Sequence, residues 1–323
     1  MKDASTDHLP PRLTLRPGES LGLVAVLGFL ILVFSLLAKN FFSAATFHQI
    51  ANQVPALTIV AVGMTFVVLT RGIDLSVGSV MALAGSVLGL AMVDAKLPLL
   101  LALPLAMGAG ALCGLANGWI SVRFGLPSFI VTLGMMQIAR GLAYLATDSQ
   151  TRYIGKPVEW LGAPLGGLGL SPAILLAILL VAIGQLVLRR TVFGRHVLVV
   201  GANEEAAIYS GIRTRPVRIA VFVIAGALAG LAAAFDSSKM GAVDPNAGAG
   251  LELSAIAAVV VGGTSLMGGR GSVFGSFLGV LIIATLGAGL NQLGASEPLK
   301  LLVTGLVIVS AVVGDAWRGK QGN

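Results

Sequence analysis

The sequence predicts an all-helical protein that crosses a membrane about ten times. Of its 323 residues, 56% are hydrophobic and 11% are charged, the mean hydropathy is +0.94, and long apolar runs recur from end to end. An apolar run of about 18 residues or more can cross the hydrocarbon layer as a helix. Lipid cannot satisfy open backbone groups, which favours helices over open strands. The 43 glycines agree, because small residues let membrane helices pack closely.

The expected spans follow the apolar runs in order. They cover residues 21–38, 50–69, 75–93, 97–120, 128–146, 172–188, 217–235, 251–266, 273–290 and 299–313. The runs 251–266 and 299–313 are short for a straight crossing. Cytoplasmic connections collect Lys and Arg, and with both termini inside, most of the 21 basic residues fall on that side. These are Lys2, Arg12, Arg16, Arg71, Arg123, Arg189, Arg190, Arg195, Arg213, Arg215, Arg218, Arg270, Arg318 and Lys320.

Polar tails frame the membrane domain. Residues 1–20 are expected to form a cytoplasmic tail, 21–316 the transmembrane domain and 317–323 a second cytoplasmic tail. The first apolar run follows a long polar lead and exceeds the about 7–15 residues of a secretory signal. We therefore expect it to stay attached as a span, and cleavage after Ala38 or Ala45 is the alternative.

Two glycine-containing breaks look alike. Residues 71–74 and 267–271 each end one apolar run and lead into another that begins with Val-Gly-Ser or Phe-Gly-Ser. Asp74 and Ser76 are suited to cap the helix that follows, where the helix dipole favours an acidic group. The likeness indicates either an internal duplication of the kind found in transporters or a chance resemblance of two hairpins.

The residues that carry chemistry argue against an enzyme. The sequence has no phosphate-binding loop of the G-x-x-x-x-G-K-[ST] type. His8, His48 and His196 lie on different segments, so neither a metal cluster nor a nucleophilic triad is predicted. The single Cys113 is expected to be a small buried hydrophobe. We expect no cofactor on this chain, and the net charge of +7 reflects orientation rather than nucleic-acid binding.

A transporter without an ATPase site uses either an ion gradient or a subunit that supplies the energy. Ion coupling requires ionisable groups deep in the spans, where each costs about 2.5–3.5 kcal/mol. The acidic residues fall near the ends of the expected spans, and Arg140 is the most deeply placed charge. This distribution favours energy from another subunit.

The charged connection 189–218 is the strongest indication of such a subunit. It carries six arginines and two glutamates in a chain that is 11% charged, and apolar runs flank it on both sides. A compact charged segment between spans is typical of a docking surface for a soluble protein. The alternative is a connection that only sets the orientation of the chain.

Four ordered blocks run through most of the chain. They are Thr70–Ser79 (T-R-G-I-D-L-S-V-G-S), Asn117-Gly118 with Pro127–Gly134 and Arg140-Gly141, Thr191–Gly211, and Gly250–Ser272. Together they resemble the ribose/xylose/arabinose family of ABC importer permeases. The sequence departs from the family pattern at Val199-Val200 and at Val243–Pro245, and the second departure bears on the identity of the substrate or of the binding protein.

The resemblance implies that residues 189–216 form a coupling loop that docks on an ATP-binding subunit through a short helix at 204–209. Asn203 is suited to cap this helix, and Gly201 and Gly211 are expected to bracket it as helix breakers. Nearby basic side chains are suited to reach acidic groups on the partner; these are Arg195, Arg213 and Arg215. The expected coupling residues are Arg195, Gly201, Asn203, Glu204, Glu205, Ala206, Ala207 and Gly211.

The resemblance also implies a substrate, a location and partners. We expect a multi-pass inner-membrane permease, one half of a homodimeric or heterodimeric pore, that imports a monosaccharide such as ribose. ATP and Mg²⁺ are expected on the ATPase subunit, and a periplasmic sugar-binding protein selects the solute. A weakly polar passage then suffices, with Ser76, Asn117, Thr132 and Gln137 as the expected pathway residues. Alternatively these side chains hold helices together.

Other functions stay open at this point. One is an ion-coupled secondary transporter, and another is a passive pore or scaffold. Within the ABC class, the solute is alternatively a nucleoside, a polyol or a signalling furanone.

Overall fold

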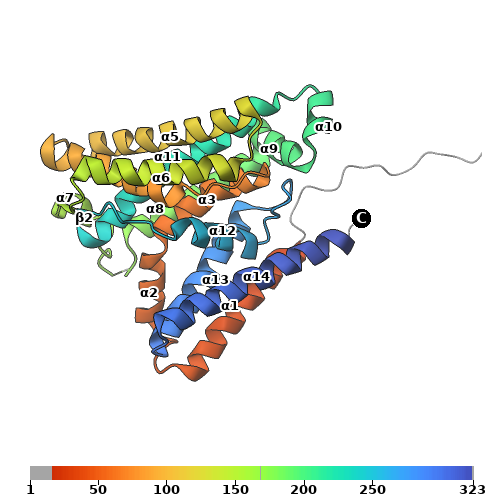
Figure 1. Ribbon diagram of the computed structural model, residues 1–323. Coiled ribbons are helices and arrows are strands. Elements are labelled where there is room, and N and C mark those ends of the chain that lie inside the picture. The colour runs from red at the N-terminus through yellow and green to blue at the C-terminus, as the bar shows by residue number, and fades with distance from the viewer. Residues whose placement is uncertain (1–16, 168, 322–323) are drawn as a thin grey trace, which may run out of the picture.

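The computed structural model describes residues 17–167 and 169–321 and is dominated by helices (Figure 1). Two short strands, β1 (Arg152–Tyr153) and β2 (Ala242–Val243), pair antiparallel. One π-helical turn, Leu90–Asp94, continues α4. The helices are α1 (Pro17–Leu37), α2 (Ala44–Gln53), α3 (Pro55–Leu69), α4 (Val77–Gly89), α5 (Leu99–Phe124), α6 (Ser128–Thr147), α7 (Lys156–Glu159), α8 (Pro172–Arg190), α9 (Val192–Ala202), α10 (Glu204–Tyr209), α11 (Thr214–Met240), α12 (Leu251–Val261), α13 (Val273–Gln292) and α14 (Glu297–Gln321).

The architecture is that of an all-α polytopic membrane protein. Among the described residues, six helices are long and apolar enough to cross a membrane, and a seventh span results if α2 and α3, bent by 50°, count as one. Large apolar side chains such as Leu100, Leu112 and Leu145 are exposed, as expected for surfaces that face lipid or another membrane subunit. The count of ten spans stays a prediction.

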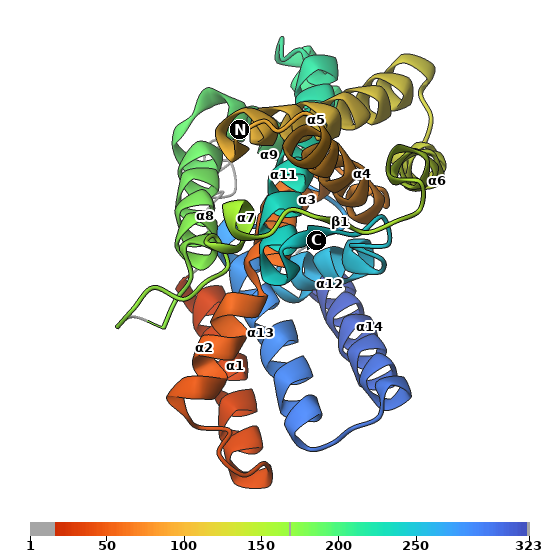
Figure 2. The same ribbon diagram turned by 90° about the vertical axis from the view of Figure 1, so that its left-hand side faces the viewer.

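Two groups of helices make up the molecule. In Figure 1, α3, α5, α6 and α11 run along one direction, and α1, α2, α13 and α14 extend below them. Figure 2, from the end that carries β1 and α7, shows the same division. This end lies opposite α9 and α10, and we call the two ends the β1 end and the α10 end.

The crossing of α5 and α11 brings two backbones into contact. A side chain at Gly114 would overlap the Phe222 carbonyl oxygen, and one at Gly110 would overlap that of Gly226. The reverse also holds, because a side chain at Gly230 would overlap backbone of α5. Small residues permit this approach, and close packing rather than hydrophobic burial is what holds helices together in lipid.

Helix α12 is shorter than the expected span 251–266. Its 11 residues rise about 16 Å at 1.5 Å per residue, roughly half of the hydrocarbon thickness. The helix ends at Val261 because the following connection needs left-handed backbone, with φ of +83° at Gly263, +77° at Gly268 and +72° at Gly269. Irregular segments therefore flank α12 on both sides, at 242–250 and at 262–271.

The chain ends are only partly described. Most of the expected tail 1–20 lies outside the described residues, as do residues 322–323. Helix α14 continues to Gln321, through most of the stretch 317–323 that was expected to be a tail. Its C-terminal end lies on the same side of the molecule as α10 (Figure 1).

Replacing Gly114 by alanine tests the contact between α5 and α11. Gly114→Ala is expected to lower the apparent melting temperature in detergent, because the added methyl group overlaps the Phe222 carbonyl and overpacking costs about 1–3 kcal/mol. The matched control is Gly108→Ala on the same helix, where an added Cβ has nothing within 4 Å. That variant should keep or raise the melting temperature, because alanine favours a helix over glycine by about 1 kcal/mol. Equal losses in both variants would contradict the packing.

Candidate functional site

The charged connection folds into two short helices, α9 and α10, between α8 and α11. Helix α10 covers the predicted residues Glu204–Tyr209. The Asn203 side chain accepts a hydrogen bond from the Ala206 amide at 3.0 Å, which confirms the cap. Gly211 adopts a left-handed backbone with φ of +78°, which confirms that it ends the helical segment.

Gly201 has a different role from the predicted one. It lies inside α9 and is buried, so the prediction that it breaks the chain before α10 is wrong. The extended backbone of Asn203 (φ −157°, ψ 104°) makes this turn. A side chain at Gly201 would overlap the Leu69 carbonyl oxygen, so glycine lets α9 touch the end of α3. Helix α9 was not predicted from the sequence, although Thr191 caps it by accepting from the Gly194 amide at 3.1 Å.

One face of α10 is anchored and the other is free. Ala207 is fully buried and belongs to an apolar cluster with Leu69, and Glu204 pairs with Arg218 at 3.3 Å. In contrast, Tyr209 is 91% exposed and Ile208 is 56% exposed. Exposed aromatic and aliphatic side chains next to charges are the composition of a protein-binding surface.

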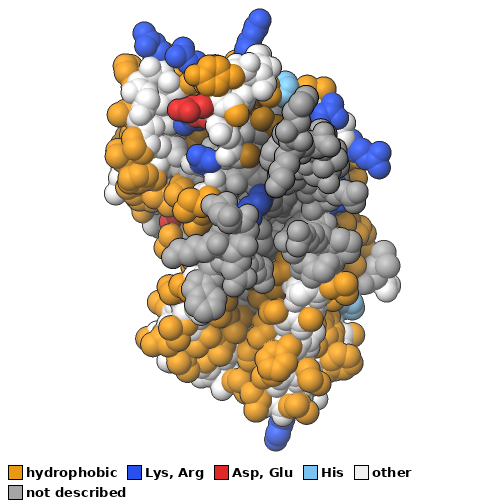
Figure 3. All heavy atoms as spheres, turned by 90° about the vertical axis from the view of Figure 1, so that its right-hand side faces the viewer, with side chains coloured by type: hydrophobic (Ala, Val, Ile, Leu, Met, Phe, Trp, Pro, Cys, Tyr) orange, Lys and Arg blue, Asp and Glu red, His pale blue; other side chains and the backbone are white. Residues whose placement is uncertain are grey.

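Basic side chains surround this face. Arg195, Arg213 and Arg215 are exposed, and no side-chain hydrogen bond or ion pair is found for them among the described residues. Glu205 and Ala206 are exposed as well. Figure 3 looks onto the α10 end, where basic side chains stand out over the upper part and hydrophobic ones cover much of the lower part. The predicted coupling residues therefore gather at one end of the molecule.

Three of the four predicted pathway residues meet in one buried cluster. Ser76, Asn117 and Thr132 are at most 1% exposed. The Ser76 amide and hydroxyl donate to Asp74 Oδ1 at 2.8 and 2.6 Å, and Asn117 Nδ2 donates to Ser76 Oγ at 2.9 Å. Thr132 Oγ1 accepts from the Leu75 amide at 3.1 Å. These contacts hold the connection 70–76 in place.

Asp74 is a buried carboxyl in this connection, outside the spans. Burial raises the pKa of Asp74 above its ordinary value, and the hydrogen bonds from Ser76 lower it. A carboxyl whose pKa is raised in the folded state stabilises the fold most when protonated. This contribution is fully present below the pKa of the unfolded chain and is lost as the pH rises through the folded-state pKa.

The fourth predicted pathway residue lies elsewhere, beside residues that the sequence analysis did not select. Gln137 is on an exposed face of α6. One turn further, Arg140 Nη1 donates to the carbonyls of Pro245 and Ala247, at 2.5 and 2.9 Å. Arg140 thus satisfies backbone groups of the irregular segment 242–250. The sequence did indicate the importance of Arg140, because it is the charged residue placed most deeply in the expected spans.

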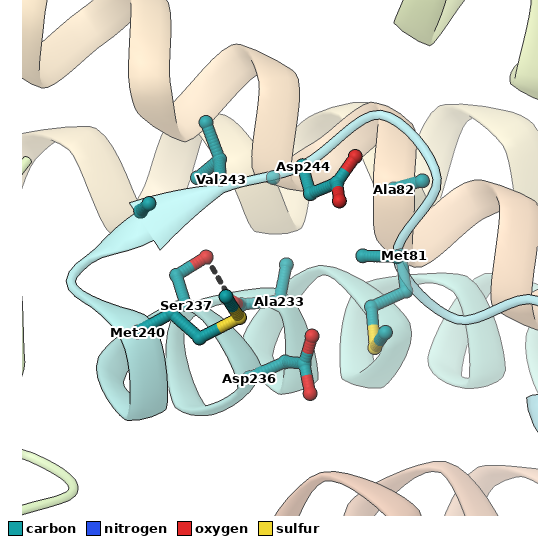
Figure 4. A pocket seen from close by; sticks show the side chains of 11 residues that line it. Met81, Ala82, Ala233, Asp236, Ser237, Met240, Val243 and Asp244 are labelled. Atoms are coloured by element: carbon teal, nitrogen blue, oxygen red, sulfur yellow. Dashed lines mark hydrogen bonds between the residues drawn. The ribbon is translucent and has the colours of Figure 1, made fainter. Parts of the chain in front are cut away.

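The segment 242–250 also contacts Tyr144 and borders a cavity. Tyr144 donates from its hydroxyl to Asn246 Oδ1 at 2.7 Å. On another side of the segment, a cavity of about 110 Å³ lies between α4, α11 and β2 (Figure 4). Asp236 and Asp244 approach it from opposite sides. The volume is well below the roughly 300 Å³ of a closed ligand pocket, so this cavity is too small to enclose a sugar.

Comparison with known proteins places the chain among membrane permeases. The family model for the permease component of the branched-chain amino acid transport system matches residues 46–312. The ribose import permease of Haemophilus influenzae is 38% identical over 302 residues, covering 90% of this chain and 91% of the relative. That of Bacillus subtilis is 39% identical over 305 residues, or 92% of both chains. The fructose import permease of Rhizobium meliloti is 35% identical over 315 residues, or 92% of this chain and 86% of the relative. No solved structure matches the chain.

Substitutions at Asp74 test the buried cluster. Asp74→Asn keeps an oxygen that accepts from Ser76 and removes the charge, so this variant should be at least as stable as the parent at neutral pH. Asp74→Leu leaves two buried donors of Ser76 unsatisfied, at about 1–3 kcal/mol each, and should melt lower. As the pH falls, the parent should gain stability relative to Asp74→Asn, because the buried carboxyl takes up a proton. If Asp74→Asn melted as low as Asp74→Leu, the charge itself would be required and the assignment would be wrong.

Proposed function

Because the chain belongs to the family of ABC importer permeases that its relatives represent, we propose that it is the membrane subunit of an importer for ribose or a related monosaccharide. The observation that carries the proposal is the similarity over nine-tenths of the chain to permeases named for ribose and fructose import. A separate ATPase subunit, which binds ATP and Mg²⁺, drives the transport.

The free face of α10 receives the ATPase subunit. Asn203 and Gly211 set the two ends of the helix, while Ala207 fixes its buried side. Tyr209 and Glu205 then point outward as contact groups. Arg195 and its exposed basic neighbours add electrostatic attraction to acidic groups, which raises the rate and selectivity of docking more than its affinity.

This assignment sets the orientation of the chain. The α10 end, with the C-terminal end of α14 on the same side of the molecule (Figure 1), faces the cytoplasm at a bacterial inner membrane, and the chain crosses this membrane ten times. The β1 end faces a periplasmic sugar-binding protein. A second permease copy or paralogue completes the passage.

The passage follows the polar side of α6. Gln137, Arg140 and Tyr144 recur at helical spacing along α6, and the last two contact the segment 242–250. Irregular segments beside half-helices are where transporters place substrate groups. Ser76, Asn117 and Thr132 support this surface from behind, because they fix the start of α4.

One observation favours an ion-coupled transporter: the carboxyl group of Asp74 is buried, with Asp74 only 2% exposed. Its Oδ1 already accepts two hydrogen bonds from Ser76. Within the described residues, no group of three or more His, Cys, Asp or Glu side chains is arranged to hold a metal ion. The ATP-driven proposal is therefore favoured.

Reconstitution decides between these functions. Proteoliposomes containing the permease, its cognate ATPase subunit and the binding protein should take up labelled ribose only with ATP and Mg²⁺, and ionophores should leave uptake unchanged. Unlabelled fructose and other monosaccharides, added as competitors, identify the preferred sugar. Uptake by the permease alone, or uptake that collapses with the ion gradient, would refute the proposal.

A charge reversal tests the docking face. Glu205→Arg is expected to reduce ATP-dependent uptake at least about tenfold, the size of a lost contact of about 1.4 kcal/mol, and to reduce copurification of the ATPase subunit. Insertion of the permease should be unchanged, because Glu205 is exposed. The control is Glu297→Arg, a 73% exposed carboxylate at the start of α14. Normal copurification and uptake by Glu205→Arg would remove α10 from the interface.

A further inference from the structure

Arg71 occupies an unusual position at the end of α3. It follows the last helical residue, Leu69, by two positions and has a left-handed backbone with φ of +61°. Residues other than glycine rarely adopt such a backbone, so its surroundings have to hold it there.

The Arg71 guanidinium binds three backbone carbonyls from two distant segments. Its Nε donates to the carbonyls of Gly201 and Met267 at 2.7 and 2.8 Å, and its Nη2 donates to that of Ala202 at 2.7 Å. Gly201 and Ala202 end α9, where carbonyls lack helical partners and carry the negative end of the helix dipole. Hydrogen bonds from a charged donor are the stronger kind.

Backbone contacts reinforce this junction. The Gly269 amide donates to the Leu69 carbonyl at 2.9 Å. Side chains would collide at three glycines here: Gly201 with Leu69, Gly268 with Arg71 and Gly269 with Ala202. The end of α3, the end of α9 and the connection 262–271 therefore touch without intervening side chains, which leaves little room for one to slide past another.

We propose that Arg71 is a positioning residue that transmits movement of α10 to α3 and α12. This inference rests on the proposed docking of α10. Only Asn203 separates α10 from Ala202, whose carbonyl Arg71 holds. The hydrogen bond from Arg71 to the Met267 carbonyl reaches the connection that follows α12. A shift of α10 is carried through this hydrogen bond into the short helix α12.

The far end of α12 is held in a similar way. Arg140 donates to the carbonyls of Pro245 and Ala247 in the segment before α12. An arginine from another helix thus binds the backbone on each side of α12. Movement that enters at Arg71 reaches the polar side of α6, where the proposed passage lies.

Arginine suits this role better than lysine. Its planar guanidinium presents five N–H donors in a fixed fork, whereas the lysine ammonium is a compact point charge on a flexible stem. A lysine at position 71 keeps the charge beside α9 but does not reproduce bonds to two segments at once.

The test measures sugar molecules imported per ATP hydrolysed, in purified complexes that contain a full complement of ATPase subunit. Arg71→Met should assemble and hydrolyse ATP but import about tenfold less sugar per ATP, a loss typical of residues that couple two sites. Arg71→Lys should fall between it and the parent. The control is Arg270→Met, because Arg270 is exposed in the same connection and no side-chain hydrogen bond of Arg270 is found in the described part of the chain. An unchanged ratio in Arg71→Met would overturn the proposal, since a merely structural residue lowers the amount of complex and not its efficiency.

Hydrogen exchange of the unmodified complex gives a second measurement that does not depend on folding of a variant. Addition of ATP and vanadate should change the protection of residues 262–271 together with that of α10. A change confined to α10 would overturn the proposal. Failure of the parent and of Arg270→Met to move sugar would count against the proposed function instead.

Discussion

Backbone groups inside a membrane have to find partners within the protein, and this constraint bears on the breaks between the described helices. Helix α12 ends at Val261 after 11 residues, short of a regular crossing, and α3 ends at Leu69, where its expected span ends. Two arginines bind carbonyls that have no helical partner. Arg71 binds the carbonyl of Gly201 near the α10 end of the molecule, and Arg140 binds that of Pro245 towards the β1 end. A charged side chain inside a span is expensive, and Arg140 is retained in α6, where it binds backbone carbonyls of the segment 242–250.

Close contacts between distant segments hold both ends of the molecule. At the α10 end, glycine contacts and the Arg71 bonds join three segments into one body, with an exposed helix on its surface. Towards the β1 end, β2 pairs with β1, a side chain at Gly78 would overlap the Gly248 carbonyl oxygen, and the segment 242–250 borders a small cavity.

Local signals were readable from the sequence, and relations between distant segments were not. The ends of α10 were predictable because Asn203 and Gly211 act on their own neighbours. The role of Gly201 was predicted wrongly, because the contact that requires a glycine there is with the backbone of Leu69, far away in the chain. Ser76, Asn117 and Thr132 stood out as polar residues in apolar runs, but the sequence does not tell whether such groups face one another or a passage.

The sidedness and contact of α10 test the central claim most directly. Tyr209→Cys, in a background where the single native cysteine is replaced by Cys113→Ala, places a reactive group at the most exposed site of this helix. An impermeant maleimide should label it in inside-out vesicles and not in intact cells, and a short cross-linker should join it to the ATPase subunit. Labelling from outside intact cells would contradict the account.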